Sequence, residues 1–115
     1  MTFSLPVPPS VNTMYRNVPG VGRVKTGEYK KWIAEAQTEL MIQRQDVPVI
    51  KRGNKATVHY VVPYNGRRDL DNYAKALSDI LVSSGILPTD NMTCLTGVAI
   101  KVGDVDNVVV TVTPA

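Results

Sequence analysis

The side chains best suited to chemistry are the acidic and basic ones in the second half of the chain. Asp69 and Asp71 stand two residues apart at the start of a helical pattern, and Asp90 follows that pattern. Three converging carboxylates would supply the oxygen ligands that a hard cation such as Mg²⁺ takes, with water and substrate phosphate completing the octahedron. The sequence therefore predicts a magnesium site, provided that the turn 88–91 folds back toward the start of the helix.

Two cations, Arg67 and Arg68, directly precede the first of these carboxylates. Positive charges near a helix N-terminus oppose the helix dipole, so they need an anion nearby to justify them. A phosphate group would serve, because arginine binds phosphate oxygens through two parallel hydrogen bonds. The pair predicts a ligand that carries phosphates.

Simpler explanations exist for the same residues. Asp69 or Asp71 could cap the helix by accepting hydrogen bonds from free backbone N–H groups, an interaction typically worth ~1 kcal/mol. Lys75 lies four residues from both Asp71 and Asp79. It could therefore form an ordinary ion pair on the helix surface, worth only ~0.3–0.5 kcal/mol. Both explanations stay open at this point, and a capping residue does not exclude a catalytic neighbour.

The helix that would hold these residues has one apolar stripe. Its spacing of three, four and seven residues predicts an amphipathic helix of about fifteen residues, or ~20 Å. The expected buried positions are Leu70, Tyr73, Ala74, Leu77, Ile80 and Leu81. Asp71, Lys75 and Asp79 fall on the opposite, exposed face.

The N-terminal region predicts a strand and a flexible arm. Phe3–Val7 reads as a short strand that ends at two prolines, because proline cannot donate to a central ladder. Ser10–Lys25 is rich in Asn, Gly and Pro and predicts a mobile loop. Its cations suit contact with a nucleic-acid backbone. They are Arg16, Arg23 and Lys25.

The remaining elements follow from their periodicity. Thr26 predicts the N-cap of a helix that ends near Gln45. Its apolar stripe is Tyr29, Trp32, Ile33, Ala36 and Leu40. Lys55–Tyr64 alternates as a half-buried strand does. Thr93–Val102 and Val108–Thr113 predict a β-hairpin with a five-residue connection.

These elements follow the order strand, helix, strand, helix, strand, strand. That order predicts a single α/β (α+β) domain over residues 1–115, a two-layer sandwich in which two helices pack on a mixed sheet. The net charge of +3 permits an anionic partner without demanding one. The single cysteine, and the lack of a signal peptide or an apolar span, predict a soluble cytoplasmic protein without a membrane segment.

Two runs of the sequence resemble a known family, the RusA-type Holliday junction resolvases, which are small phage-borne endonucleases of DNA recombination. The first run follows the family pattern Pro-Pro-Ser-x-Asn-x-x-Tyr-Arg from Pro8 to Arg16. The second comprises Arg67, Arg68, Asp69, Leu70, Asp71, Asn72, Lys75, Asp79, Gly85 and Asp90. Family members often carry an Asp-Asp pair where this chain reads Thr89-Asp90-Asn91.

The resemblance implies a homodimeric, Mg²⁺-dependent nuclease, in which Mn²⁺ could substitute, without an organic cofactor. Its metal-binding aspartates match Asp69, Asp71 and Asp90, and an essential lysine matches Lys75. Paired phosphodiester hydrolysis at a four-way DNA junction, in bacterial or phage recombination and repair, is then the expected activity. Asp79 and Asn72 are expected beside the site. The cations expected to contact DNA phosphates are Arg16, Arg23, Lys25, Arg67 and Arg68.

Two other readings remain. The chain could be a nucleic-acid-binding module that uses the basic arm without cutting, its aspartates serving as caps and ion-pair partners. It could also be a nuclease for other branched DNA, which would cut forks and junctions equally.

Overall fold

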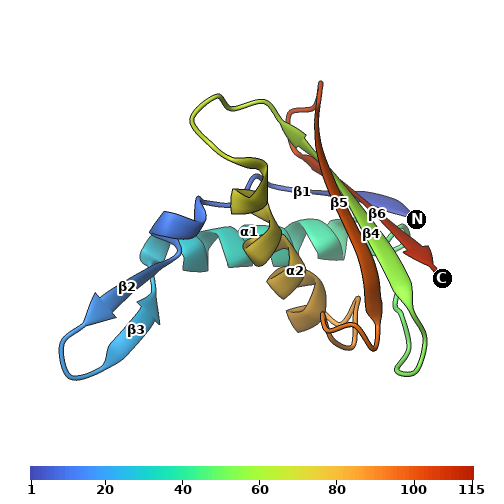
Figure 1. Cartoon of the computed structure of the whole chain (residues 1–115), viewed down its shortest axis with the longest axis horizontal. Coiled ribbons are helices and arrows are strands. Elements are labelled where there is room, and N and C mark those ends of the chain that lie inside the picture. The colour runs from blue at the N-terminus through green and yellow to red at the C-terminus, as the bar shows by residue number, and fades with distance from the viewer.

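A four-stranded mixed sheet forms one layer of the computed structural model, which describes all residues from 1 to 115 (Figure 1). Its order is β1-β6-β4-β5. β6 runs antiparallel to both β1 and β4, whereas β5 runs parallel to β4. The strands are β1 (Thr2–Leu5), β4 (Ala56–Pro63), β5 (Leu95–Gly103) and β6 (Val108–Pro114).

Two α-helices and a smaller hairpin complete the fold. The helices are α1 (Gly27–Ile42) and α2 (Ala74–Ser83). Short 3₁₀ helices, η1 (Val11–Thr13) and η2 (Leu70–Tyr73), precede the hairpin and α2 respectively. The hairpin pairs β2 (Tyr15–Val18) with β3 (Gly22–Lys25) and projects from the body (Figure 1). Neither α-helix has the length and apolarity that a membrane span requires.

One face of the sheet is buried and the other is half-exposed. Alternate residues of β4 are buried, namely Ala56, Val58, Tyr60 and Val62, and β6 alternates likewise. The helices bury their own apolar stripes in the same core, which contains 24 residues. A sheet covered on one face shows this alternation. The predicted α+β sandwich is therefore confirmed.

The first helix agrees closely with its sequence pattern. The Thr26 hydroxyl accepts a hydrogen bond from the Tyr29 backbone N–H at 3.2 Å, so Thr26 is the N-cap. Helix α1 ends at Ile42, three residues before the predicted end. The Trp32 indole is buried and donates to the Pro6 carbonyl at 2.9 Å, which fixes α1 against the segment that follows β1.

The predicted hairpin between Thr93 and Thr113 is wrong. β5 and β6 do not pair, because β4 lies between them and hydrogen-bonds to both. The loop between β5 and β6 therefore crosses over a strand. A parallel neighbour of β4 needs a long crossover connection, and α2 provides it.

The predicted mobile loop over Ser10–Lys25 is also wrong. It contains η1 and the paired strands β2 and β3, whose register runs from Tyr15 opposite Lys25 to Val18 opposite Gly22. Pro19 and Gly20, which suggested a loop, lie in the turn between the two strands, and Gly22 begins β3.

The pattern of the second helix is shifted at its start. Residues 70–73 form η2 rather than α-helix, and Leu70 is 41% exposed instead of buried. Ala76 is fully buried, whereas Ala74, which the periodicity placed on the stripe, is half-buried. The stripe of Tyr73, Leu77, Ile80 and Leu81 is buried as predicted.

Candidate active site

The turn after β4 presents two free carboxylates. Asp69 has the extended backbone of an N-cap, with φ −80° and ψ 151°, but its side chain accepts no capping hydrogen bond. Asp71 lies in the first turn of η2 and also makes no side-chain hydrogen bond or ion pair. Both residues are exposed. The simple capping explanation therefore does not account for either carboxylate, and both are available to a ligand.

The two arginines before these carboxylates have different surroundings. Arg67 is exposed, and only its backbone N–H is bonded, to the Asn65 side-chain oxygen at 3.0 Å. The Arg68 guanidinium donates to the Pro8 carbonyl at 2.9 Å and lies 4.1 Å above the Tyr73 ring. Its Nε and second terminal nitrogen are buried without a partner. Arg68 thus connects the Pro8-Pro9 segment to the turn that bears Asp69 and Asp71, which we call the carboxylate turn.

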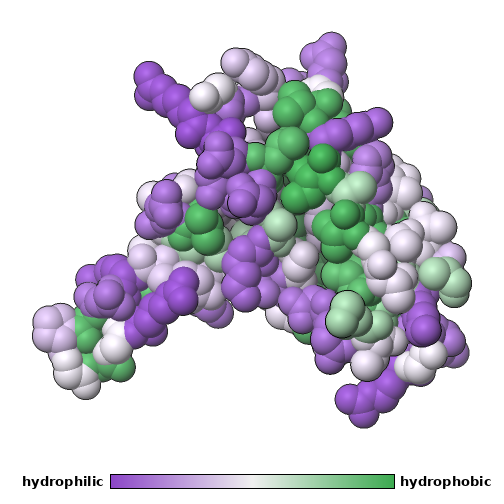
Figure 2. Space-filling view, in the orientation of Figure 1, coloured by the Kyte–Doolittle hydropathy of each residue, from purple (hydrophilic) through white to green (hydrophobic).

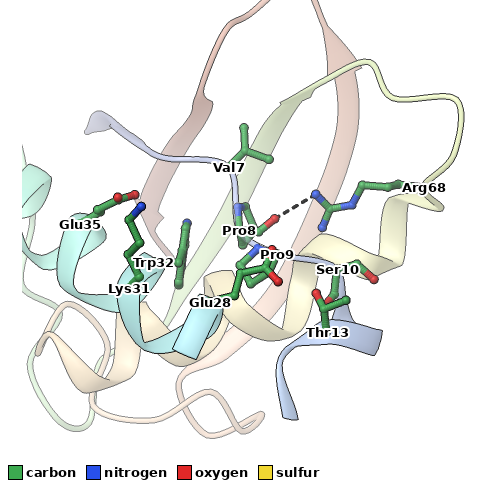
Figure 3. Close-up of a pocket in the computed structure, with 10 residues that line it drawn as sticks. All are labelled: Val7, Pro8, Pro9, Ser10, Thr13, Glu28, Lys31, Trp32, Glu35 and Arg68. Carbon is green, nitrogen blue, oxygen red and sulfur yellow. Dashed lines mark hydrogen bonds between the residues drawn. The ribbon is translucent and has the colours of Figure 1, made fainter. Parts of the chain in front are cut away.

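Figure 3 shows the pocket that Arg68 lines together with that segment. The pocket has a volume of about 440 Å³, and its wall includes Pro8, Pro9, Glu28, Lys31 and Trp32. It separates the start of α1 from the turn before η2. The two sequence runs that resemble the nuclease family therefore meet in space, which their separation in the chain did not indicate.

Lys75 points along α2 toward its C-terminal side. Its ammonium nitrogen lies 3.4 Å from an Asp79 carboxylate oxygen, and no pairing with Asp71 occurs. The Lys75 side chain is 57% exposed, so this pair contributes little to stability. Asn72 is half-buried, and its backbone N–H donates to the Asp69 carbonyl at 3.1 Å. The predicted neighbours of the carboxylates thus lie on η2 and α2, with Lys75 still able to reach a ligand.

Asp90 lies in a different environment. It is exposed and lines a second pocket, of about 430 Å³, together with Asp79, Tyr29, Tyr15 and Lys25. The wall of that pocket also includes Val82 and Ser83, at the C-terminal end of α2. β5, which follows Asp90, begins beside Ala56 at the opposite end of β4 from the carboxylate turn. The chain therefore delivers Asp90 toward the far end of α2.

Two tyrosines near the second pocket are held neutral. Burial raises the pKa of Tyr29 to about 12, and the nearby Asp79 carboxylate adds to this effect. Burial also raises the pKa of Tyr60 to about 12, with a smaller rise from Asp90, while the hydrogen bond to Ser78 opposes the rise. The Tyr60 hydroxyl and the Ser78 hydroxyl are 3.4 Å apart. Negative charge on Asp79 and Asp90 therefore faces phenol groups that stay protonated.

A single copy of the chain does not gather the predicted metal ligands. Asp69, Asp71 and Asp90 have the hard oxygen donors that Mg²⁺ prefers, and none of the three forms an ion pair within the chain. No group of three or more His, Cys, Asp or Glu side chains is arranged to hold a metal ion, however. The three carboxylates are of the type that binds Mg²⁺, but in one copy of the chain they are not grouped around a common point.

The remaining predicted cations lie on the hairpin. Arg16, Arg23 and Lys25 are exposed there. The Arg23 guanidinium lies 4.1 Å above the Tyr15 ring, and the Lys25 nitrogen lies 6.0 Å from the Tyr29 ring. These contacts orient the two cations without neutralising them.

Comparison with known families agrees with these residues. The sequence model of one family, described as endodeoxyribonuclease RusA, matches residues 6–113. A search of curated proteins finds no match to this sequence. The matched range includes both resembling runs and nearly all of the fold, so the expected DNA endonuclease class is confirmed at the level of the family. The chain belongs to the RusA endodeoxyribonuclease family.

Proposed function

We propose that this protein is a Mg²⁺-dependent resolvase that cuts Holliday junctions at paired positions during DNA recombination and repair in the bacterial cytoplasm. Membership of the nuclease family supports the activity. The observation that carries the proposal is the state of Asp69 and Asp71, two exposed carboxylates two residues apart that serve neither as helix caps nor as ion-pair partners. Such freedom suits a site for a cation and a phosphate.

Each residue has a proposed role in this reaction. Asp69, Asp71 and Asp90 would hold Mg²⁺, or Mn²⁺ in its place, which when bound supplies a Lewis acid and an activated water. Lys75 would leave Asp79 to contact the scissile phosphate and stabilise its developing negative charge. Arg67 would bind a flanking phosphate, a contact that positions DNA without reading its sequence. Arg68, which contacts Pro8 and Tyr73, would hold the carboxylate turn in place.

A second copy of the chain would complete the site. Because one copy leaves Asp90 apart from the other two carboxylates, we propose a homodimer in which one subunit supplies Asp69 and Asp71 and its partner supplies the third ligand. A two-fold dimer also presents two equal sites to a junction that has two strands to cut.

An exposed apolar surface beside the carboxylate turn supports this arrangement. Leu70, Val98 and Val102 are each more than 40% exposed. η2 contacts β5, and Figure 2 shows hydrophobic side chains gathered over β5. β5 is also an edge strand, with backbone groups free along one side. We expect Val98→Glu to convert the dimer to monomers in analytical ultracentrifugation and to abolish cleavage.

The direct test is cleavage of a synthetic four-way junction by the wild type and by Asp71→Asn, with Mg²⁺ and with EDTA. We expect cutting only by the wild type with the metal, and a loss of at least about 100-fold in the variant, since even indirect partners of metal ligands contribute ~10–100-fold. Asp106→Asn, a substitution of an exposed aspartate in the loop before β6, is the matched control and should cut normally.

Two outcomes would contradict the proposal. If both proteins bind junctions and neither cuts with any divalent metal, the chain is a binding module. If the wild type cuts forks as readily as junctions, it is a nuclease for branched DNA in general.

A further inference from the structure

The hairpin formed by β2 and β3 projects from the body and is held at its base by hydrogen bonds and ring contacts to α1. Its root is fixed to the start of α1 by the Thr26 hydroxyl, which donates to the Thr13 carbonyl at 2.7 Å, and by the Thr26 backbone N–H, which donates to the Met14 carbonyl at 2.9 Å. Met14 is fully buried, and the Tyr15 ring meets the Tyr29 ring edge-to-face at 5.6 Å. The ribbon therefore keeps a fixed direction relative to the body.

The tip of the hairpin carries no polar side chain. The turn reads Val18-Pro19-Gly20-Val21-Gly22, and the Val21 N–H donates to the Val18 carbonyl at 3.0 Å. Pro19 in the second turn position and Gly20 in the third, at φ 76°, are typical of a type II turn. Val21 is 71% exposed. Hairpin turns commonly use Asn, Asp or Ser, so an apolar and proline-stiffened tip is unusual.

The strands behind this tip are basic. Arg16, Arg23 and Lys25 are exposed, and no acidic residue occurs between positions 10 and 27. Figure 2 shows the separation, with pale and hydrophobic atoms at the end of the projection and strongly hydrophilic atoms between the end and the body. A contact that involved only phosphates would need the cations but not the apolar tip.

We propose that this hairpin is a wedge for branched DNA, in which Pro19 and Val21 pack against the face of a base pair at the branch point while the three cations bind the flanking phosphates. A two-stranded β-ribbon fits a DNA groove. Apolar side chains that include proline separate stacked bases in other DNA-binding proteins. A branch point lowers the cost, because stacking is already interrupted there. The inference rests on the proposed function, since it requires DNA as the ligand.

The test uses a four-way junction with 2-aminopurine next to the branch point, in EDTA so that no strand is cut. Saturating wild-type protein should raise the fluorescence severalfold, because the probe brightens when it is unstacked. Val21→Ser should lose at least half of that rise, while its dissociation constant changes less than about threefold. Val49→Ser is the matched control, because Val49 is 70% exposed and lines a pocket near the C-terminal end of α1.

A basic-strand variant separates the two parts of the hairpin. Arg23→Gln should weaken junction binding and reduce the salt dependence of binding by about one unit of the log–log slope. The fluorescence rise at saturation should stay normal. Thermal unfolding of every variant checks that its fold is intact, and we expect at most a small shift, in Arg23→Gln, because the side chains are exposed and only Arg23 stacks on a ring.

The wedge is overturned if the wild type causes no fluorescence rise, or if Val21→Ser matches the wild type and Val49→Ser. Cleavage of the unlabelled junction with Mg²⁺ by the same wild-type sample tests the proposed function separately. Cleavage with an unchanged Val21→Ser signal would reject the wedge alone. A Val21-dependent signal without cleavage would reject the resolvase function and leave the wedge standing.

Discussion

The two ends of α2 present acidic residues in opposite ways. At its start, Asp69 and Asp71 are exposed, unpaired and flanked by arginines. Toward its far end, Asp79 is paired with Lys75, and Asp90 lines a pocket with Tyr29, whose pKa burial raises to about 12. Asp79 and the pocket that Asp90 lines lie along the C-terminal half of α2, a helix of ten residues that is about 15 Å long. Under the proposed function, one subunit would therefore carry the ligands of the metal in two separate places.

Mixing two inactive subunits tests this separation most strongly. If the site combines the start of α2 from one subunit with Asp90 from its partner, a heterodimer of Asp71→Asn and Asp90→Asn contains one intact site. Each homodimer contains none. We expect the co-expressed, co-purified heterodimer to nick junctions on one strand, and each parent to be inactive, as measured on denaturing gels. An inactive heterodimer would instead favour a site within one subunit.

Lys75 connects the two ends, so its substitution sharpens the comparison next. If Lys75 contacts the scissile phosphate, Lys75→Met should lower the cleavage rate by roughly 10²–10³. Its ion pair with Asp79 is exposed, so the free energy of unfolding should change by less than about 0.5 kcal/mol. Lys30→Met, at an exposed lysine of α1, is the control for charge and should cut normally. Loss of stability without loss of cleavage would make Lys75 a surface ion-pair partner only.

Arg67 and Arg68 distinguish binding from positioning at the start of α2. Arg68→Lys should lower the free energy of unfolding by roughly 1–2 kcal/mol in urea denaturation, because it breaks the hydrogen bond to Pro8 and the stacking on Tyr73. Arg67→Lys should change it by less than about 0.5 kcal/mol, since that side chain is exposed. Equal effects of the two substitutions would show that the Pro8 contact contributes nothing to stability.

The last prediction concerns Tyr60 of β4, beside Ser78 of α2, at high pH. Ionised Tyr60 is less favourable in the folded chain, since its pKa rises from 10.0 to about 12. Its contribution to stability is therefore complete below pH 10 and disappears as the pH rises toward 12. Tyr60→Phe should show a shallower fall in the free energy of unfolding between pH 10 and 12, measured by circular dichroism. A parallel fall in both proteins would mean that other groups cause it.

The sequence predicts elements whose local signals agree with their surroundings. Thr26 and the stripe behind it define α1, and the alternation of Lys55–Tyr64 defines β4. The start of α2 shows where such signals fail. A 3₁₀ turn contains three residues rather than 3.6, so η2 rotates Leu70 off the stripe that α-helical spacing predicts.

Local sequence patterns did not predict which strands pair, nor the hairpin formed by β2 and β3. Apolar alternation shows that β5 and β6 are strands but does not show that β4 lies between them. Pro19 and Gly20 are compatible with a loop or a tight turn, and the flanking strands are too short and polar to decide. In the proposed dimer, the convergence of Asp69, Asp71 and Asp90 would depend on how two copies assemble, which no local pattern encodes.

The pairing of β1 with β6 has a consequence for synthesis in the cell. Thr2 lies opposite Thr111, and the N-terminal amine donates to the Val112 carbonyl. A growing polypeptide therefore cannot pair β1 until β6 has been synthesised. Arg68 donates to the Pro8 carbonyl just beyond β1, so the anchor of the turn that bears Asp69 and Asp71 lies next to the strand that pairs late.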